Sequence, residues 1–207
     1  GNVNSKSATL NVLAASVITK QPVNPVTLCQ GSSLSLYIET SGSGHIYQWK
    51  KDDNDLTDGS DITGSKTSSL TISNTTPSYT GAYTCVVDGI EISSASIVTI
   101  NPTTVINANP ADGNKCAGDA HTFTLTADGA NLTYQWYKND LTHPVAGATA
   151  NEYTINPLVI SDGGTYFCIV TGTCGEKQSS GATLTVYNNT VVNAQPSAAT
   201  IICQNTT

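Results

Sequence analysis

The chain has 207 residues, of which 38% are hydrophobic and only 11% charged, and its eight cationic residues are all lysines, against 15 acidic residues. The net charge of −7 and the absence of arginine disfavour phosphate and guanine recognition and anionic membrane surfaces. The apolar runs are too short to span a bilayer. We therefore expect no nucleic-acid partner and no membrane insertion. Low charge, no methionine and six cysteines are typical of β-rich proteins in an oxidising compartment.

The sequence repeats itself with a period of 87 residues, the spacing between Cys29, Cys116 and Cys203. Length differences between the two full copies are confined to polar stretches, where loops tolerate them. Three motifs define the repeat: Cys29-Gln30-Gly31 with Cys116-Ala117-Gly118, Tyr47-Gln48-Trp49 with Tyr134-Gln135-Trp136, and Gly81-Ala82-Tyr83-Thr84-Cys85 with Gly164-Thr165-Tyr166-Phe167-Cys168.

This register predicts four segments in chain order. Residues 1–14 contain Ala8-Thr9-Leu10-Asn11-Val12, which matches Ala182-Thr183-Leu184-Thr185-Val186. We expect 1–14 to be the last strand of a preceding domain, 15–101 and 102–188 to be complete domains, and 189–207 to be the first strands of a following domain. The repeat therefore predicts a tandem array of similar domains.

Within each copy the apolar side chains alternate with polar ones. Leu34, Leu36 and Ile38 show this period of two, as do Leu70 and Ile72, and then Tyr83 and Cys85. Alternation places one face of a strand in a core and the other in water. Several short strands in fewer than 90 residues, separated by Gly/Ser and Asp-Gly turns, predict a two-sheet sandwich.

The Trp, the following Leu-x-Ile and the run Asp162-x-Gly164-x-Tyr166-x-Cys168 resemble the immunoglobulin-like (Ig-like) fold. The resemblance implies an all-β class: tandem Ig-like antiparallel β-sandwiches in an extended rod. It places the Trp on strand C and the Tyr at the corner before strand F, where its hydroxyl binds backbone. The family's strand-B cysteine is replaced by Ile38 and Leu125. The structural core predicted from these positions is Ile38, Trp49 and Tyr83 in one copy and Leu125, Trp136 and Tyr166 in the other.

The Cys-x-Gly start, Tyr-Gln-Trp and Thr171-Gly172-Thr173-Cys174-Gly175 resemble the Ig-like repeats of very large secreted adhesins and appendage proteins of gliding, surface-living bacteria. The resemblance implies an extracellular, cell-surface location and a non-enzymatic structural shaft that mediates attachment. The implied partners are neighbouring Ig-like domains of the same long chain, further copies in a homo-oligomer or filament, and an unknown surface ligand. Two alternatives are a glycan- or protein-binding Ig-like module and a spacer of a secreted multidomain enzyme.

The disulfide candidates are all six cysteines, and two pairings stay open. By count, Cys29 would pair with Cys85 within one domain and Cys116 with Cys168 in the next, leaving Cys174 over. However, Cys29 lies at the A–B turn whereas Cys85 should face Ile38 well along strand B, and a bridge needs Cα atoms within about 7 Å. In the alternative, end-to-end stacking brings Cys29 to Cys174 across the joint. Cys203 repeats the position of Cys29 and Cys116.

We expect no catalytic residue, no cofactor and no resident metal. No nucleophile elbow, phosphate-binding glycine loop or paired short Cys/His spacing occurs, and the three histidines lie in unrelated segments. The stretch 52–61 contains five aspartates, and Asp53, Asp55 and Asp58 raise the question of a calcium site, although their spacing is not that of an EF-hand. We interpret this stretch as a solvated loop after strand C.

Overall fold

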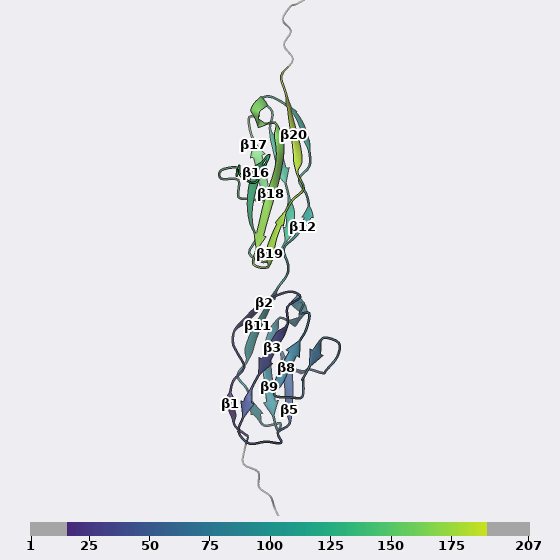
Figure 1. Cartoon of the computed structure of the whole chain (residues 1–207), viewed down its shortest axis with the longest axis vertical. Helices are drawn as coiled ribbons and strands as arrows, with labels where there is room; N and C mark the ends of the chain where they lie inside the picture. Colours follow the sequence, from purple (N-terminus) through teal and green to yellow (C-terminus); the bar gives the residue numbers. More distant parts are fainter. Residues whose placement is uncertain (1–15, 190–207) are drawn as a thin grey trace, which may run out of the picture. The chain divides into compact units, whose positions relative to one another are not determined.

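The computed structural model describes residues 16–189, which belong to two compact units (Figure 1). Of the described residues, the first unit contains 16–105, 127–133 and 170–177, and the second contains 106–126, 134–169 and 178–189. Apart from two single-turn 3-10 helices, the regular elements described are strands. No helix between residues 16 and 189 is long and apolar enough to cross a membrane. The strands predicted within 1–14 and 189–207 lie almost entirely outside the described residues.

The strands of the first repeat form two main sheets. The larger has the order β2-β11-β9-β5-β6, with β10 on β9, and the smaller has the order β3-β8-β7, while β1 pairs with β4. Their bounds are β1 Ile18–Lys20, β2 Val26–Cys29, β3 Leu34–Tyr37, β4 Glu39–Thr40, β5 Tyr47–Lys51, β6 Asn54–Asp55, β7 Ile62–Thr63, β8 Ser69–Ile72, β9 Gly81–Val87, β10 Glu91–Ile92 and β11 Ser96–Asn101.

The second repeat uses the same order. Its larger sheet is β13-β20-β18-β16 with β19 on β18, and β14 pairs with β17 and β12 with β15. The bounds are β12 Val105–Ala108, β13 Gly113–Cys116, β14 His121–Thr124, β15 Thr126–Asp128, β16 Thr133–Lys138, β17 Glu152–Ile155, β18 Gly164–Gly172, β19 Gly175–Gln178 and β20 Ala182–Tyr187. In both repeats the first strand of this sheet lies parallel to the last, β2 to β11 and β13 to β20, and the other pairs described are antiparallel. The predicted all-β, Ig-like sandwich class is confirmed.

The period of two along the strands accounts for the core of the first repeat. β3 alternates buried and exposed residues, and β9 buries every second side chain from Tyr83 to Val87. Trp49 on β5 is fully buried and its neighbour across the sheet is Cys85 on β9. Ile38, 2% exposed, follows β3 directly and belongs to the same core. Strands thus contribute one face each to a single apolar layer.

The second repeat builds its core around a cluster of rings. Trp136, Leu125 and Phe123 are fully buried and Tyr166 is 2% exposed. The ring of Phe123 lies 5.8 Å from that of Trp136 and 4.7 Å from that of Tyr166, centroid to centroid. Tilted aromatic pairs at this distance contribute beyond the area they bury.

In each repeat a buried tyrosine forms a hydrogen bond to the backbone of the turn before its own strand, β9 or β18. The Tyr83 hydroxyl donates to the Tyr79 carbonyl at 2.7 Å, and the Tyr166 hydroxyl donates to the Asp162 carbonyl at 2.8 Å. Tyr79 and Asp162 end the two 3-10 helices, η1 (Pro77–Tyr79) and η2 (Ile160–Asp162). Burial raises the pKa of both phenols far above the usual value, so both remain protonated donors.

Replacing Tyr83 by Phe keeps the buried ring and removes only the corner hydrogen bond. The Tyr79 carbonyl loses its donor, so we expect the free energy of unfolding to fall by about 1–2 kcal/mol. Urea denaturation of the full chain measures this, and Tyr166→Phe should cost a similar amount. Tyr187 is 54% exposed, so Tyr187→Phe is the control and should change the free energy of unfolding little. Equal stability of Tyr83→Phe and the unmodified chain would show that the corner bond contributes nothing.

Candidate functional site

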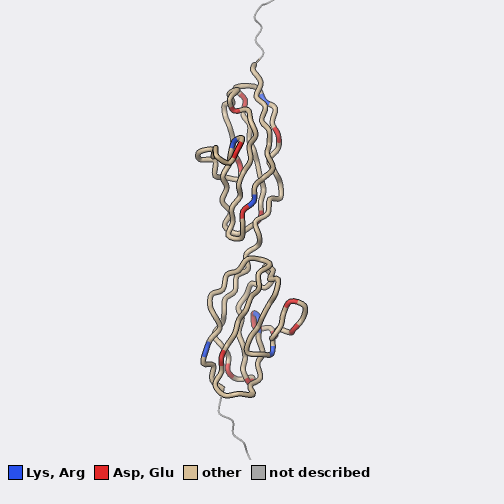
Figure 2. The backbone as a smooth tube through the Cα atoms, viewed as in Figure 1, with Lys and Arg blue, Asp and Glu red and all other residues tan. Residues whose placement is uncertain are grey.

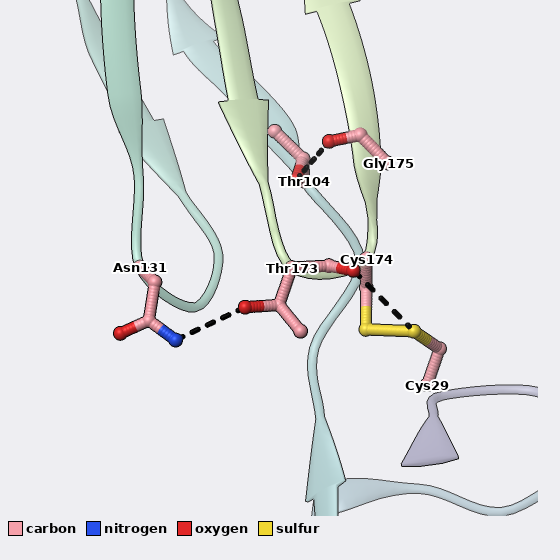
Figure 3. Close-up of a disulfide and its surroundings, with 6 residues drawn as sticks. All are labelled: Cys29, Thr104, Asn131, Thr173, Cys174 and Gly175. Atoms are coloured by element: carbon pink, nitrogen blue, oxygen red, sulfur yellow. Dashed lines mark hydrogen bonds between the residues drawn. A yellow bond between two sulfur atoms is a disulfide. The ribbon is translucent and has the colours of Figure 1, made fainter. Parts of the chain in front are cut away.

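A disulfide joins Cys29 to Cys174, two residues 145 positions apart in the chain (Figure 3). Cys29 is the last residue of β2, and Cys174 lies in the turn between β18 and β19. Their Cα atoms are 5.5 Å apart, within the usual range for a bridge. Both residues belong to the first compact unit, because the 170–177 segment lies with that unit. The bridge therefore connects strands from the two sequence repeats covalently.

The turn that carries Cys174 is fixed by hydrogen bonds on both sides. The Thr104 amide donates to the Cys174 carbonyl at 3.3 Å, and the Thr104 hydroxyl donates to the Gly175 carbonyl at 2.8 Å. The Thr173 amide donates to the Ala130 carbonyl, and its hydroxyl accepts from the Asn131 amide at 3.0 Å (Figure 3). These contacts fix the backbone of the turn that presents Cys174.

Thr104 is the residue of this site that the sequence analysis missed. It is 1% exposed although it lies in the short segment between β11 and β12. A Cβ added at Gly172 would lie 2.5 Å from the Thr104 hydroxyl oxygen, so the glycine leaves room for it. A signal was present, because a hydroxyl residue precedes each recurring valine: Ser16 before Val17, Thr104 before Val105 and Thr190 before Val191.

The other cysteines do not form the intradomain pairs that were expected by count. Cys85 and Cys168 are buried thiols and Cys116 is an exposed one, while Cys203 lies outside the described residues. The reason is geometric. Cys85 lies across the sheet from Trp49 in the middle of the core, whereas Cys29 pairs with Asn101 at the far end of β11. The expectation of Cys29–Cys85 and Cys116–Cys168 bridges is therefore corrected.

The buried thiols are chemically quiet. Burial raises the pKa of Cys85 and of Cys168 to about 11, so both stay protonated at neutral pH. In each repeat the amide of this cysteine donates to a serine hydroxyl, Ser93 or Ser179, at 2.9 Å. Neither thiol has the character of a nucleophile or a metal ligand.

In the acidic stretch after β5, Asp52, Asp55 and Asp58 each interact with different partners. Asp52 accepts from the Ala82 amide and lies 2.6 Å from the Lys51 ammonium, Asp55 pairs with Lys50, and Asp58 accepts from the Ser65 amide. These contacts lower the pKa of Asp52, first through Lys51, and that of Asp58 through Ser65. Within residues 16–189 no three His, Cys, Asp or Glu side chains are placed to hold a metal ion. Figure 2 shows the acidic residues of this loop against a mostly uncharged backbone.

His45 forms a polar cluster with the β9–β10 turn of the first repeat. One ring nitrogen lies 2.7 Å from Asp88 Oδ2 and the other 2.7 Å from the Ser41 carbonyl. Both neighbours are acceptors, so the imidazolium, with two N–H donors, fits this site best. Accordingly the pKa of His45 is raised, first by Asp88 and then by Ser41, and that of Asp88 is lowered by the Ile46 amide and by His45.

His121 lies in the opposite kind of environment, on the core side of β14. Its ring packs edge-on against Phe123 with centroids 4.5 Å apart, and it occupies the space where a Cβ of Gly113 would lie. Among the described residues its Nε2 is a buried nitrogen without a hydrogen-bond partner. Burial lowers its pKa, and Lys115 adds to the effect. His121 is a half-buried histidine packed against the core, and His143, hydrogen-bonded to Asp140, is a surface one.

The two histidines predict opposite pH responses in the two repeats. The pKa of His45 is raised in the folded state. Its contribution to the stability of the first repeat is therefore complete below about pH 6.5 and is lost as the pH rises through the folded pKa. His121 has a lowered pKa, so its repeat is destabilised as the pH falls below about 6.5. Hydrogen-exchange mass spectrometry of the full chain at pH 5.5 and 8.5, corrected for intrinsic exchange rates, reports each repeat separately.

On acidification we expect protection to rise around 41–47 and 85–92 and to fall around 113–125. His45→Gln should abolish the first change and leave the second. A first repeat whose protection does not change with pH in the unmodified chain would contradict the role given to the His45 cluster.

The sequence and the fold are similar to those of known immunoglobulin domains. Models of the immunoglobulin domain match residues 17–88 and 101–186. No curated protein matches the sequence. Among solved structures, an I-band fragment I67–I69 from titin is 18% identical with a TM-score of 0.67, covering 86% of this chain and 67% of that one. DIP-gamma IG1+IG2 is 17% identical with a TM-score of 0.65, covering 85% and 99%.

The insect immune protein hemolin is 19% identical with a TM-score of 0.59, and the match covers 87% of this chain and 49% of that one. At these identities the solved structures show the fold alone. The two family matches cover most of the described residues, and they agree with the strand order, the buried tryptophans and the tyrosine corners. The chain belongs to the immunoglobulin family, whose domain it matches in tandem over residues 17–88 and 101–186.

Proposed function

We propose that this chain is a non-enzymatic structural segment, a shaft of Ig-like domains in a large extracellular bacterial surface adhesin or multi-chain appendage that mediates attachment. The observation that carries the proposal is the Cys29–Cys174 bridge, which takes the chain between these two cysteines, with both buried tryptophans, off the shortest covalent path through the molecule. Its immediate partners are neighbouring Ig-like domains of the same chain. A filament of further copies and an unknown surface ligand complete the set of partners.

Recurring polar side chains support a structural role, because they bind backbone in both repeats. Side-chain amides, carboxylates and indole N–H groups at equivalent positions satisfy loop and strand-edge groups that would otherwise lack partners. The Gln48 and Gln135 side chains donate to carbonyls beside β5 and β16, and the Trp49 and Trp136 indoles donate to the carbonyls of Thr67 and Ala150. Asp52 and Asn139 accept from the amides of Ala82 and Thr165. Gln21 and Asn109 accept from the amides of Ser94 and Ser180, and Asn24 and Asp112 accept from those of Ile97 and Thr183.

The bridge has a direct mechanical consequence. A chain pulled from its ends carries force along its shortest covalent path, which passes from Cys29 to Cys174 through one sulfur–sulfur bond. The 145-residue separation between them is removed from that path. Fully extended, this length would be roughly 500 Å at 3.3–3.6 Å per residue. A shaft built this way lengthens only by the segments outside the loop when its domains unfold.

The location outside the cell rests on sulfur chemistry and composition. Disulfides persist in oxidising compartments and are rare in the cytosol. The low charge and the absence of arginine and methionine agree with that setting. The bacterial assignment rests on the resemblance of the Cys-x-Gly start, Tyr-Gln-Trp and Thr-Gly-Thr-Cys-Gly motifs to repeats of large bacterial surface proteins. Complete sequencing of the source gene, with its repeat number and terminal domains, tests that assignment.

Single-molecule stretching of the full chain tests the shaft proposal. In oxidising buffer we expect unfolding to release only the segments outside the Cys29–Cys174 loop. A reductant should add roughly 500 Å of contour length. The double variant Cys29→Ser/Cys174→Ser should show the long extension without reductant, and Cys116→Ser should retain the short one. Full extension of the oxidised, unmodified chain would remove the mechanical basis of the proposal.

A binding module is the second candidate, favoured by one observation. Ile46 and Ile90, 74% and 85% exposed, lie next to the His45–Asp88 cluster, where the Asp88 amide donates to the Ile46 carbonyl. Two such exposed isoleucines on loops are suited to contact a partner. A glycan array and a protein-binding screen with the full chain separate the candidates. Specific binding lost in Ile46→Ser/Ile90→Ser would favour the binding module over the shaft.

A further inference from the structure

Cys116 occupies in the second repeat the position that Cys29 occupies in the first. Each is the last residue of the strand that lies parallel to the final strand of its sheet: Cys29 pairs with Asn101 and Cys116 with Tyr187. Cys29 is bridged, whereas Cys116 is an exposed free thiol. Cys29 therefore shows that a cysteine at the position of Cys116 can form a disulfide.

The backbone after the two cysteines is also the same. The next residue donates its amide to the residue paired with the cysteine, at 2.8 Å in both repeats: Gln30 to Asn101 and Ala117 to Tyr187. A glycine with positive φ follows, Gly31 at 85° and Gly118 at 93°. The residue after it returns its amide to the cysteine carbonyl at 3.1 Å in both cases. Cys116 is thus presented by the same rigid turn as Cys29.

The other half of the bridge defines the partner that Cys116 requires. Cys174 lies in a Thr-Cys-Gly turn that is hydrogen-bonded to Thr104, in the three-residue connection after Asn101. After Tyr187 the sequence again runs three residues, ending in Thr190, before Val191 resumes the repeat. An Ig-like repeat joined at this point would bring the corresponding turn to Cys116 as the second repeat brings Cys174 to Cys29.

We propose that Cys116 is a second bridging site, whose partner is the cysteine in the Thr-Cys-Gly turn of a further Ig-like repeat following Tyr187. This inference rests on the proposed tandem shaft. Cys85 and Cys168 are buried and cannot serve as the partner. Cys203 repeats the position of Cys29 and Cys116 in sequence, so it belongs to the same half of the bridge as Cys116.

The chemistry is thiol oxidation by disulfide exchange. The Cys116 thiolate attacks a small-molecule disulfide such as oxidised glutathione and releases one thiol. The turn cysteine, as thiolate, then displaces the second glutathione from Cys116. Two protein thiols lose two protons and two electrons, and one glutathione disulfide is reduced to two glutathione molecules.

The test replaces residues 188–207 with a further repeat joined in register after Tyr187. Residues 1–187 are followed directly by a copy of residues 102–187 in which Cys116→Ser and Glu176→Asp distinguish its peptides by mass. The protein is folded in a glutathione redox buffer, alkylated without reduction and digested. We expect loss of the alkylated Cys116 peptide and a new peptide linking Cys116 to the turn cysteine of the appended copy. The matched control changes that turn cysteine to Ser and should return Cys116 to the alkylated state.

Alkylated Cys116 beside an intact Cys29–Cys174 bridge would overturn the proposal, and it would leave the stretching test of the shaft unaffected. A protected Cys168 in the appended copy shows that the copy has folded. If the appended copy does not fold, a second experiment uses the original chain with Cys29→Ser. This substitution frees Cys174, which can then form a disulfide with Cys116 of a second molecule. Disulfide-linked oligomers with a Cys116–Cys174 peptide, absent from Cys29→Ser/Cys116→Ser, support the site, and a purely monomeric variant refutes it.

Discussion

Burial of one tryptophan in each repeat is the constraint on which the rest of the structure depends. Trp49 and Trp136 are fully buried. Their indole nitrogens donate at 2.9 Å to the carbonyls of Thr67 and Ala150, which lie shortly before β8 and β17. An aromatic ring of this size removes about 150–250 Å² from water, worth roughly 4–6 kcal/mol at 25 cal/mol per Å². The strands on both sides must alternate their side chains in register with it, which fixes the two sheets and leaves only turns for other roles.

That constraint also explains why the sulfur chemistry lies at the ends of the strands. The core position on strand B that would face Cys85 or Cys168 is filled by a branched apolar side chain, Ile38 or Leu125, and both thiols remain protonated. Cys29 and Cys174 instead lie at a strand end and a turn, where a bridge can form without a change in the core. The bridged cysteines are therefore not among the buried residues of either core.

The sequence predicted those features that depend on local periodicity. Alternating apolar residues identified the strands, because alternation follows from spacing along one segment, whereas the tyrosine corners were implied by the resemblance of the Gly-x-Tyr-x-Cys run to the Ig-like fold. The choice between Cys29–Cys85 and Cys29–Cys174 depends instead on where strand ends lie in space, which spacing leaves open. Thr104 was missed because its burial is caused by a turn 70 residues away, and Asp52 because its role needs a left-handed backbone beside Gly81. The boundaries at 15, 102 and 189 stay predictions.

A bridge between equivalent ends of neighbouring repeats has a property that an intradomain bridge lacks. Cys116 lies between Cys29 and Cys174 in the chain, so a second bridge starting at Cys116 would close a loop overlapping the first. Overlapping loops place a bridge beside each connection between repeats, so force bypasses the connection and is carried within the second repeat by the segment between Cys116 and Cys174. Isolated loops within single domains would shield each core but leave the connections to carry the load alone. The position of Cys29 at the strand end, rather than in the core, is what makes the overlapping arrangement possible.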